Sequence, residues 1–248
     1  MRPINGNWQG KPGNFDPMHA LQPQASDNAW GIPDVLGTTS FAKIDWMMAY
    51  DDWRAMRNKG KRPSAQPGAV HFFTDDYRFE SCWNNPDKSA AYLAGDDIVL
   101  SPDFSLFRDH PPAMWLWNVY RSRWLGAYWQ SLGVPVIPTV GWADARSYDF
   151  CFLGLPTRSI LAVSTIGVFS QGDPTAAELF KAGYREMCER LEPTRVLNYG
   201  ERFPEELKPL AAVQTFAPFQ LQLRTIDAKK AAAALPPAQV AKQPLLKP

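Results

Sequence analysis

The sequence predicts an α/β fold in which a mainly parallel sheet, covered by outer helices, forms an incomplete or distorted (β/α) barrel. Two observations lead to this prediction. Short apolar runs recur along the chain without the polar alternation of a half-exposed strand, which is typical of strands buried on both faces. These runs alternate with segments of helical periodicity, the order that joins parallel strands through helical crossovers. An open, doubly wound sheet is the alternative that the same pattern allows.

Candidate strands begin near residues 69, 97, 134, 148, 160 and 195. Pro102 follows the second of them and restricts Ser101 to extended geometry, so this strand ends in a loop. Pro138 marks the end of the third strand, or a bulge at its tip. The link between residues 152 and 160 is too short for a helix, so the strands on either side of it form a hairpin or one irregular crossing.

Three segments have helical character. Residues 41–56 and 175–191 carry apolar side chains at three- and four-residue spacing, and a capping box opens the second segment. Residues 112–132 begin with a proline and stop before Gly133, which suits the two ends of a helix. Aromatic side chains fall on nearly all sides of this helix, so neighbours should cover it all round. A guanidinium buried in it needs a carboxylate or several carbonyls as partners.

Composition divides the chain into three parts. Residues 1–29 are rich in Gly, Pro, Asn and Gln, and we expect a flexible arm. Residues 30–224 form a single α/β domain, since a chain of 248 residues with 45% hydrophobic side chains can bury one large core. Residues 225–248 consist mainly of Ala, Lys and Pro, and we expect a flexible tail.

Charge and cysteine usage limit the partners and the compartment. The 26 basic and 25 acidic side chains leave a net charge of +1, so no field of one sign attracts nucleic acid or an anionic membrane. No apolar run approaches the roughly eighteen residues of a membrane span. The three cysteines, Cys82, Cys151 and Cys188, are odd in number and far apart, which indicates a reducing compartment. We therefore expect a cytoplasmic protein without a membrane partner.

Polar side chains follow several of the predicted strands, where α/β folds gather their reactive groups. Our candidate catalytic residues are Asp75, Asp76, Asp103 and Arg123. Carboxylates that converge beside an arginine suit general acid–base hydrolysis, or hold a divalent ion for phosphoester chemistry. The simpler alternative is that these aspartates cap helices or fasten loops. The candidate substrate-binding residues are Arg78, Ser101, Thr139, Trp142 and Ser164.

No residues are assigned as metal ligands. His19, His71 and His110 are isolated, and none has the spacing of a metal site. The nucleophile elbow, the Walker loop and the dinucleotide-binding glycine motif are all missing from the sequence. The cofactor is therefore unknown, with a divalent metal as one option, and the ligand is either a small molecule or nucleic acid.

Seven short segments resemble a bacterial and phage family catalogued as domain of unknown function 4417. They are DDYRFE (75–80), SPDFS (101–105), NVYRSRW (118–124), VIPTVGW (136–142), DFCF-x-GLP (149–156), AVST-x-G (162–167) and NYG (198–200). The resemblance covers roughly residues 70–200. It implies a protein carried by phages, plasmids and integrated elements. The family has no established activity, so the resemblance assigns no role to any residue.

Two functions fit these observations, and a purely structural subunit is a third alternative. The first is a hydrolase-like enzyme whose carboxylates and arginine meet at the carboxyl ends of the strands. The second is a module of a mobile element that binds nucleic acid or a host protein through the arm, the tail and the basic loop 59–62. The sequence does not decide between them, and it indicates neither the substrate nor the oligomeric state.

Overall fold

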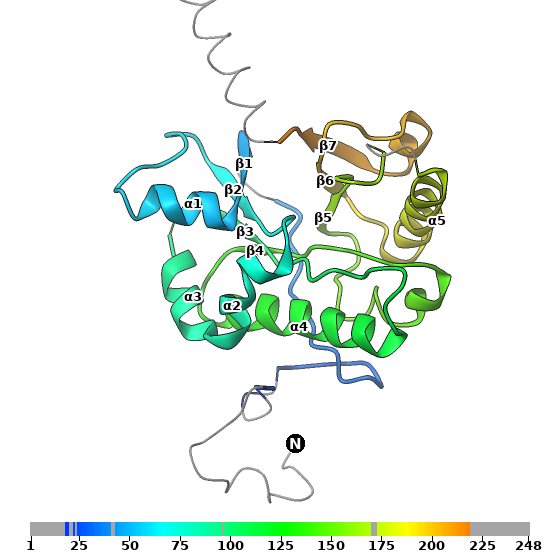
Figure 1. Ribbon diagram of the computed structural model, residues 1–248, viewed down its shortest axis with the longest axis horizontal. Helices are drawn as coiled ribbons and strands as arrows, with labels where there is room; N and C mark the ends of the chain where they lie inside the picture. The colour runs from blue at the N-terminus through cyan, green and yellow to red at the C-terminus, as the bar shows by residue number, and fades with distance from the viewer. Residues whose placement is uncertain are drawn as a thin grey trace, which may run out of the picture.

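The computed structural model describes residues 18, 19, 22, 24–40, 43–95, 97–169 and 173–218. Two sheets contain strands that all run parallel, and helices lie around them (Figure 1). The first sheet has the order β1-β2-β3-β4 and the second has the order β5-β6-β7. The strands are β1 (Trp46–Ala49), β2 (Gly68–His71), β3 (Ile98–Leu100), β4 (Val136–Ile137), β5 (Ile160–Ser164), β6 (Arg195–Tyr199) and β7 (Ala212–Phe216). The predicted α/β class with a mainly parallel sheet is confirmed.

The two sheets meet just beyond the end of β4. Thr139 forms an isolated parallel bridge with Ala162, and the Ala162 N–H donates to the Pro138 carbonyl at 2.9 Å. Strand order therefore follows chain order, as it does in a (β/α) barrel. On the opposite side, the Gln214 amide donates to the Ile44 carbonyl at 2.9 Å, and no ladder joins β7 to β1 in the described residues. This agrees with the incomplete barrel-like arrangement expected from the sequence.

Alternation along the strands separates an inner apolar cluster from two outer ones. Every strand contributes to the inner cluster, whose members on the strands are Met47, Ala69, Ile98, Leu100, Ile137, Ile160, Ala162, Leu197, Tyr199 and Phe216. Neighbouring residues such as Met48 and Val196 face outward, where the helices cover them. Burial on both faces explains why these strands read as continuous apolar runs.

The helices lie outside the strands, with α1, α3, α4 and α5 placed around them in Figure 1. They are α1 (Tyr50–Arg57), α2 (Glu80–Asn84), α3 (Pro86–Leu93), α4 (Pro112–Ser131) and α5 (Pro174–Leu191), with 3₁₀ turns at η1 (Asp76–Arg78), η2 (Ala145–Asp149) and η3 (Glu205–Leu210). Helix α4 ends before Gly133, whose φ of +84° is left-handed, as the sequence predicts. Buried residues lie all along α4, in line with its aromatic content.

Two predicted elements are wrong. The segment 41–56 is not one helix, because β1 occupies 46–49 before α1 begins at Tyr50. The strand expected near 148 is the 3₁₀ turn η2 followed by further turns. Side-chain bonds hold this turn: the Asp144 carboxylate accepts from the Arg146 N–H at 2.9 Å, and the Ser147 hydroxyl donates to the Asp144 carbonyl at 2.6 Å. Such local bonds compete with strand pairing.

The start of α5 and the last strand also differ from the prediction. Asp173 caps α5 by accepting from the N–H groups of Thr175 (2.9 Å) and Ala176 (3.2 Å), so the capping box predicted at Thr175 is wrong. In strand β7, Gln214 and Thr215 interrupt the apolar residues, and most of the strand is exposed or half-buried. The segment is a strand because it pairs with β6, and its own residues do not predict one.

The predicted arm and tail fall largely outside the described residues. Of the segment 1–29, the structure describes residues 18, 19, 22 and 24–29, and the His19 ring bonds to the Trp83 carbonyl at 2.6 Å. This piece of the segment packs on the domain. The tail 225–248 lies wholly outside the described residues. None of the described helices combines the length and the apolar character of a membrane span.

Candidate functional site

A pocket of about 1070 Å³ opens at the carboxyl ends of β2, β3, β4 and β5. The loops that follow these strands line it, together with one side of α5. The lining residues with polar or aromatic side chains are Phe73, Thr74, Asp75, Asp76, Tyr77, Asp103, Phe104, Ser105, Phe107, Arg108, Trp142, Ser164 and Phe180. Parallel α/β folds place their reactive groups at this edge, because strand ends and loops converge there.

Five of the nine predicted site residues line the pocket. They are Asp75, Asp76, Asp103, Trp142 and Ser164. Arg123 and Thr139 lie behind it, where they share a second cavity of only about 10 Å³ with Asp103. Ser101 and Arg78 line neither cavity. The structure therefore gathers the three predicted aspartates around one opening and leaves the two predicted arginines outside it.

Asp103 is the half-buried acid at the contact between the two cavities. Its carboxylate accepts no hydrogen bond from the described part of the chain. A Cβ added to Gly141 would lie 3.3 Å from Asp103 Oδ1, so the missing side chain leaves this oxygen its space. Burial and, to a smaller extent, the charge of Asp76 raise the pKa of Asp103 to about 7, and the charge of Arg123 opposes the rise.

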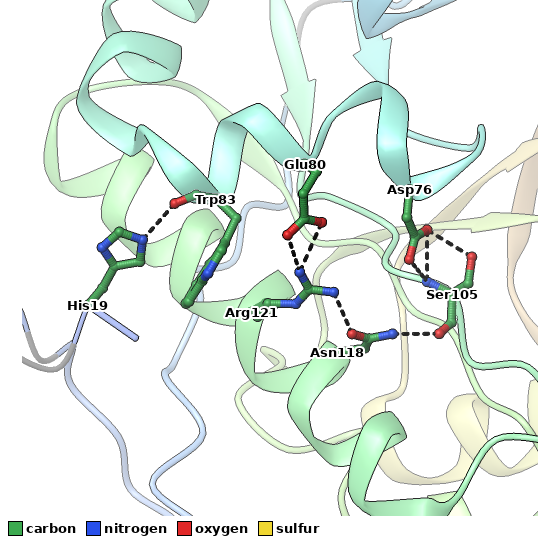
Figure 2. Close-up of polar contacts among 7 residues, drawn as sticks. All are labelled: His19, Asp76, Glu80, Trp83, Ser105, Asn118 and Arg121. Carbon is green, nitrogen blue, oxygen red and sulfur yellow. Dashed lines mark hydrogen bonds and ion pairs between the residues drawn. The ribbon is translucent and has the colours of Figure 1, made fainter. Parts of the chain in front are cut away.

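Asp76 connects two of the loops around the pocket. Both of its carboxylate oxygens accept from the Ser105 N–H at 3.1 Å, and Oδ1 also accepts from the Ser105 hydroxyl at 2.8 Å (Figure 2). The loop after β2 is thereby tied to the loop after β3. Asp75, by contrast, is exposed at the pocket rim. The neighbouring aspartates thus differ in role: Asp76 fixes a loop and Asp75 remains open to solvent.

Arg123 is buried and satisfied by carbonyl groups. Only 2% of its surface is exposed, and its guanidinium donates to the carbonyls of Leu153 (3.2 Å), Thr139 (3.0 Å) and Cys151 (2.8 Å). Desolvation lowers the pKa of Arg123 to about 10. The sequence predicts a carboxylate or several carbonyls as partners of a guanidinium buried in α4, and Arg123 has several carbonyls. Arg123 acts on Asp103 through its charge from behind the pocket, and its bonding leaves little capacity for an external anion.

Ser101 and Thr139 form two hydrogen bonds that connect the ends of β3 and β4. The Thr139 hydroxyl donates to the Ser101 carbonyl at 2.7 Å, and the Thr139 N–H donates to the Ser101 hydroxyl at 2.8 Å. Both residues are buried, so their polar atoms hold the sheet together below the pocket. Arg78 points away to Asp51, at 2.7 Å. The geometry therefore gives these predicted binding residues structural contacts.

Trp142 and Ser164 contribute to the pocket wall. The Trp142 indole donates to the Leu179 carbonyl of α5 at 3.1 Å, and a Cβ added to Gly183 would come within 2.2 Å of the indole nitrogen. Helix α5 can approach this closely because residue 183 has no side chain. The Ser164 hydroxyl donates to the Tyr199 carbonyl at 3.2 Å, so it ties β5 to β6 at the pocket edge.

An aromatic rim was not anticipated from the sequence. Tyr77 is 76% exposed and Phe107 is 56% exposed, and both line the pocket mouth. Arg108 also lines it, and its guanidinium contacts the Asp173 carboxylate at 2.6 Å, which joins the loop after β3 to the start of α5. Their position in the loops that follow β2 and β3 is the signal that could have identified them.

Within the described ranges, no group of three or more His, Cys, Asp or Glu side chains is placed to hold a metal ion. The groups that the pocket offers are instead a carboxyl with a pKa near 7, two further carboxylates and several aromatic rings. Such a set can transfer protons and bind an apolar or planar ligand.

Comparisons with known proteins give one family and two relatives. A family model described as domain of unknown function DUF4417 matches residues 24–217. The Gene 1 protein of Mycobacterium phage L5 is 41% identical over 198 residues, which cover 79% of this chain and 82% of the relative. The Gene 1 protein of Mycobacterium phage D29 is 41% identical over 193 residues, covering 78% and 68%. No solved structure matches significantly.

Proposed function

Because the chain belongs to the DUF4417 family and is similar to phage proteins, we propose that it is a phage-type enzyme that hydrolyses its substrate with Asp103 as general acid–base. The observation that carries this proposal is the state of Asp103. Its carboxyl lines a large pocket at the strand ends, accepts no hydrogen bond from the described residues, and has a pKa raised to about 7. General acid–base groups work best when their pKa lies near the working pH.

The chemistry requires one proton to move twice. The Asp103 carboxylate takes a proton from a water molecule, whose oxygen attacks the electrophilic carbon of the substrate. The protonated Asp103 then returns the proton to the leaving group as its bond to that carbon breaks. Arg123 favours the ionised form that acts as base, whereas burial and Asp76 favour the protonated form that acts as acid. These opposing effects keep both forms accessible near neutral pH.

Charge in the pocket favours a neutral or cationic substrate. Three carboxylates line it, from Asp75, Asp76 and Asp103, and its lining arginine, Arg108, already contacts Asp173 at 2.6 Å. A phosphoester would meet repulsion there unless a cation accompanied it. Esters and amides fit better, and the aromatic rim at Tyr77 and Phe107 suits their apolar or ring-shaped parts.

The alternative, a module that binds nucleic acid or a host protein, has less support. Residues 1–17 and the tail lie outside the described residues. In the basic loop, Arg62 contacts the Asp97 carboxylate at 2.8 Å. A cytoplasmic location remains part of our proposal, supported by free thiols at Cys82, Cys151 and Cys188.

The test is a comparison of turnover in matched variants. Wild-type protein is assayed against p-nitrophenyl esters, p-nitrophenyl glycosides and bis(p-nitrophenyl) phosphate. Asp103→Asn should lower the turnover found by about 10²–10⁴-fold, since the amide cannot transfer the proton, while the melting temperature does not fall below that of the wild type. Asp109→Asn, an exposed site in the same loop outside the pocket lining, should retain activity. Full activity in Asp103→Asn would contradict the proposal, as would binding of nucleic acid by a protein inactive on every substrate.

A further inference from the structure

A continuous chain of polar contacts runs from the surface of α2 to the pocket. Arg121 Nη1 donates to both carboxylate oxygens of Glu80, at 2.8 and 3.0 Å, and Arg121 Nη2 donates to Asn118 Oδ1 at 2.6 Å. Asn118 Nδ2 donates to the Ser105 carbonyl at 2.7 Å. Ser105 in turn binds Asp76 through its N–H and its hydroxyl (Figure 2). Helices α2 and α4 are thereby connected to two pocket loops.

The direction of these bonds is fixed by chemistry. A guanidinium has donors and no acceptor, so the Asn118 oxygen must face Arg121. The amide nitrogen of Asn118 then faces Ser105, whose carbonyl is an acceptor. Asn118 and Arg121 are only 7% and 9% exposed, so water cannot readily replace either partner. Loss of one link leaves buried polar groups unpaired on both sides of the break.

Arg121 holds the same loop at a second point. Its guanidinium carbon lies 3.8 Å from the centre of the Phe104 ring, a cation–π contact inside the protein. Phe104 and Ser105 directly follow Asp103 in the chain. We infer that Arg121 and Asn118 are positioning residues that fix the loop 103–105 and, through it, the placement of Asp103 relative to Asp76. Neither residue of the pair on α4 needs to touch the substrate for this role.

The arrangement has a measurable electrostatic consequence. Burial of Asp103 and the charge of Asp76 both raise the pKa of Asp103. A loosened loop admits water to Asp103 and lets Asp76 move away, and both changes lower that pKa. The inference rests on the proposed function, since it matters for catalysis only if Asp103 is the acid–base group. Its readout, however, is a titration that requires no substrate.

The experiment measures the pKa of Asp103 by carboxyl ¹³C NMR titration of the full chain, with Asp103→Asn used to assign the signal. In Asn118→Leu, which keeps the size of the side chain and removes both bonds, the Asp103 pKa should fall by about one unit or more. Glu80→Gln weakens the outer end of the chain, where the Glu80 side chain is 38% exposed, and should give a smaller fall in the same direction.

Gln130→Leu is the matched control. Gln130 also lies on α4, and its amide bonds to both backbone groups of Leu36, accepting at 2.8 Å and donating at 2.9 Å. Its loss should lower the melting temperature as Asn118→Leu does, yet leave the Asp103 pKa unchanged. An unchanged Asp103 pKa in Asn118→Leu, or in Glu80→Gln if the first variant does not fold, would overturn the positioning role.

The two proposals can fail separately. If Asp103→Asn abolishes turnover while Asn118→Leu leaves the Asp103 pKa unchanged, the proposed function stands and the positioning role falls. If Asn118→Leu lowers the Asp103 pKa and no variant affects turnover, the positioning role stands and the proposed function falls.

Discussion

The His71 ring of β2 packs against the Tyr199 ring of β6, with their centroids 3.9 Å apart. Since β2 and β6 belong to different sheets, the contact joins the two sheets across the interior. His71 Nδ1 accepts from the Phe73 N–H at 3.1 Å, and Nε2 has no hydrogen-bond partner among the described residues. Burial lowers the pKa of His71 to about 3, so the ring is neutral in the folded protein at physiological pH.

This histidine should make the fold sensitive to acid. The folded-state pKa lies below the ordinary value of 6.5, so the unfolded chain binds the extra proton as the pH falls through 6.5 toward 3. The His71 contribution to the free energy of unfolding should decrease by about 2 kcal/mol between pH 7 and pH 5. His71→Phe should remove this loss, as measured by urea unfolding at both pH values. A wild-type pH dependence in His71→Phe would contradict the assignment.

Asp103 should give the free energy of unfolding the opposite pH dependence to that of His71. Its folded-state pKa of about 7 lies above the ordinary value of 3.8, so its contribution is fully present below pH 3.8 and is lost as the pH rises through 7. Asp103→Asn should therefore raise the free energy of unfolding by about 2 kcal/mol at pH 8, allowing for partial exposure, and change it little at pH 4. Calorimetry of both proteins at the two pH values checks this. An equal change at both would exclude the titration of Asp103 as its cause.

Arg123→Met should be strongly destabilising. The change leaves the buried carbonyls of Thr139, Cys151 and Leu153 without their donor, at a cost of about 3 kcal/mol or more in the free energy of unfolding. It also removes the positive charge behind Asp103, so the Asp103 pKa should rise. Denaturant unfolding and NMR titration measure the two effects.

Arg146→Met serves as the control for Arg123→Met. Arg146 is 61% exposed in its side chain and pairs with Asp144 at 2.8 Å, so its loss should cost less than about 1 kcal/mol. Equal losses in the free energy of unfolding in the two variants would indicate that the hydrogen bonds from Arg123 to the three carbonyls contribute no special stability.

His19→Ala should release the N-terminal segment from the domain. The ring stacks on Trp124 with centroids 4.6 Å apart and bonds to the Trp83 carbonyl at 2.6 Å. We expect a loss of about 1 kcal/mol, a changed tryptophan fluorescence spectrum, and faster proteolysis near residue 19. Met18→Ala, at a side chain that is 50% exposed, should leave all three unchanged. Identical proteolysis of wild type and His19→Ala would show that the contact does not hold the segment.

The elements that could be predicted from the sequence are those whose burial is uniform. Strands β2, β3, β5 and β6 are compact apolar runs, and α4 is bounded by a proline and a glycine. Strand β1 is short and continues directly into α1, so its residues merge with the helical pattern. Strand β7 is recognised only through its pairing with β6, and η2 through bonds among its own side chains. These three elements, β1, β7 and η2, form because of contacts in the folded protein that their sequence patterns do not show.

For the site, the rule of strand ends predicted the location but not the direction of each side chain. Asp75, Asp76 and Asp103 do line one pocket. Ser101 and Thr139 also follow strand ends, those of β3 and β4, yet their polar atoms bind each other within the sheet. The sequence predicts which residues lie at a strand end. Whether such a side chain faces the pocket or bonds within the sheet depends on its neighbours in the folded chain.

The bridge at Thr139 has a consequence for local opening. Its backbone joins the two sheets, its carbonyl accepts from Arg123, and its hydroxyl holds Ser101. Separation of the sheets at this point would therefore break the support beneath Asp103 in the same event. We expect amide hydrogen exchange at Val140 and Ala162, whose N–H groups bond across the joint, to slow together when a ligand occupies the pocket.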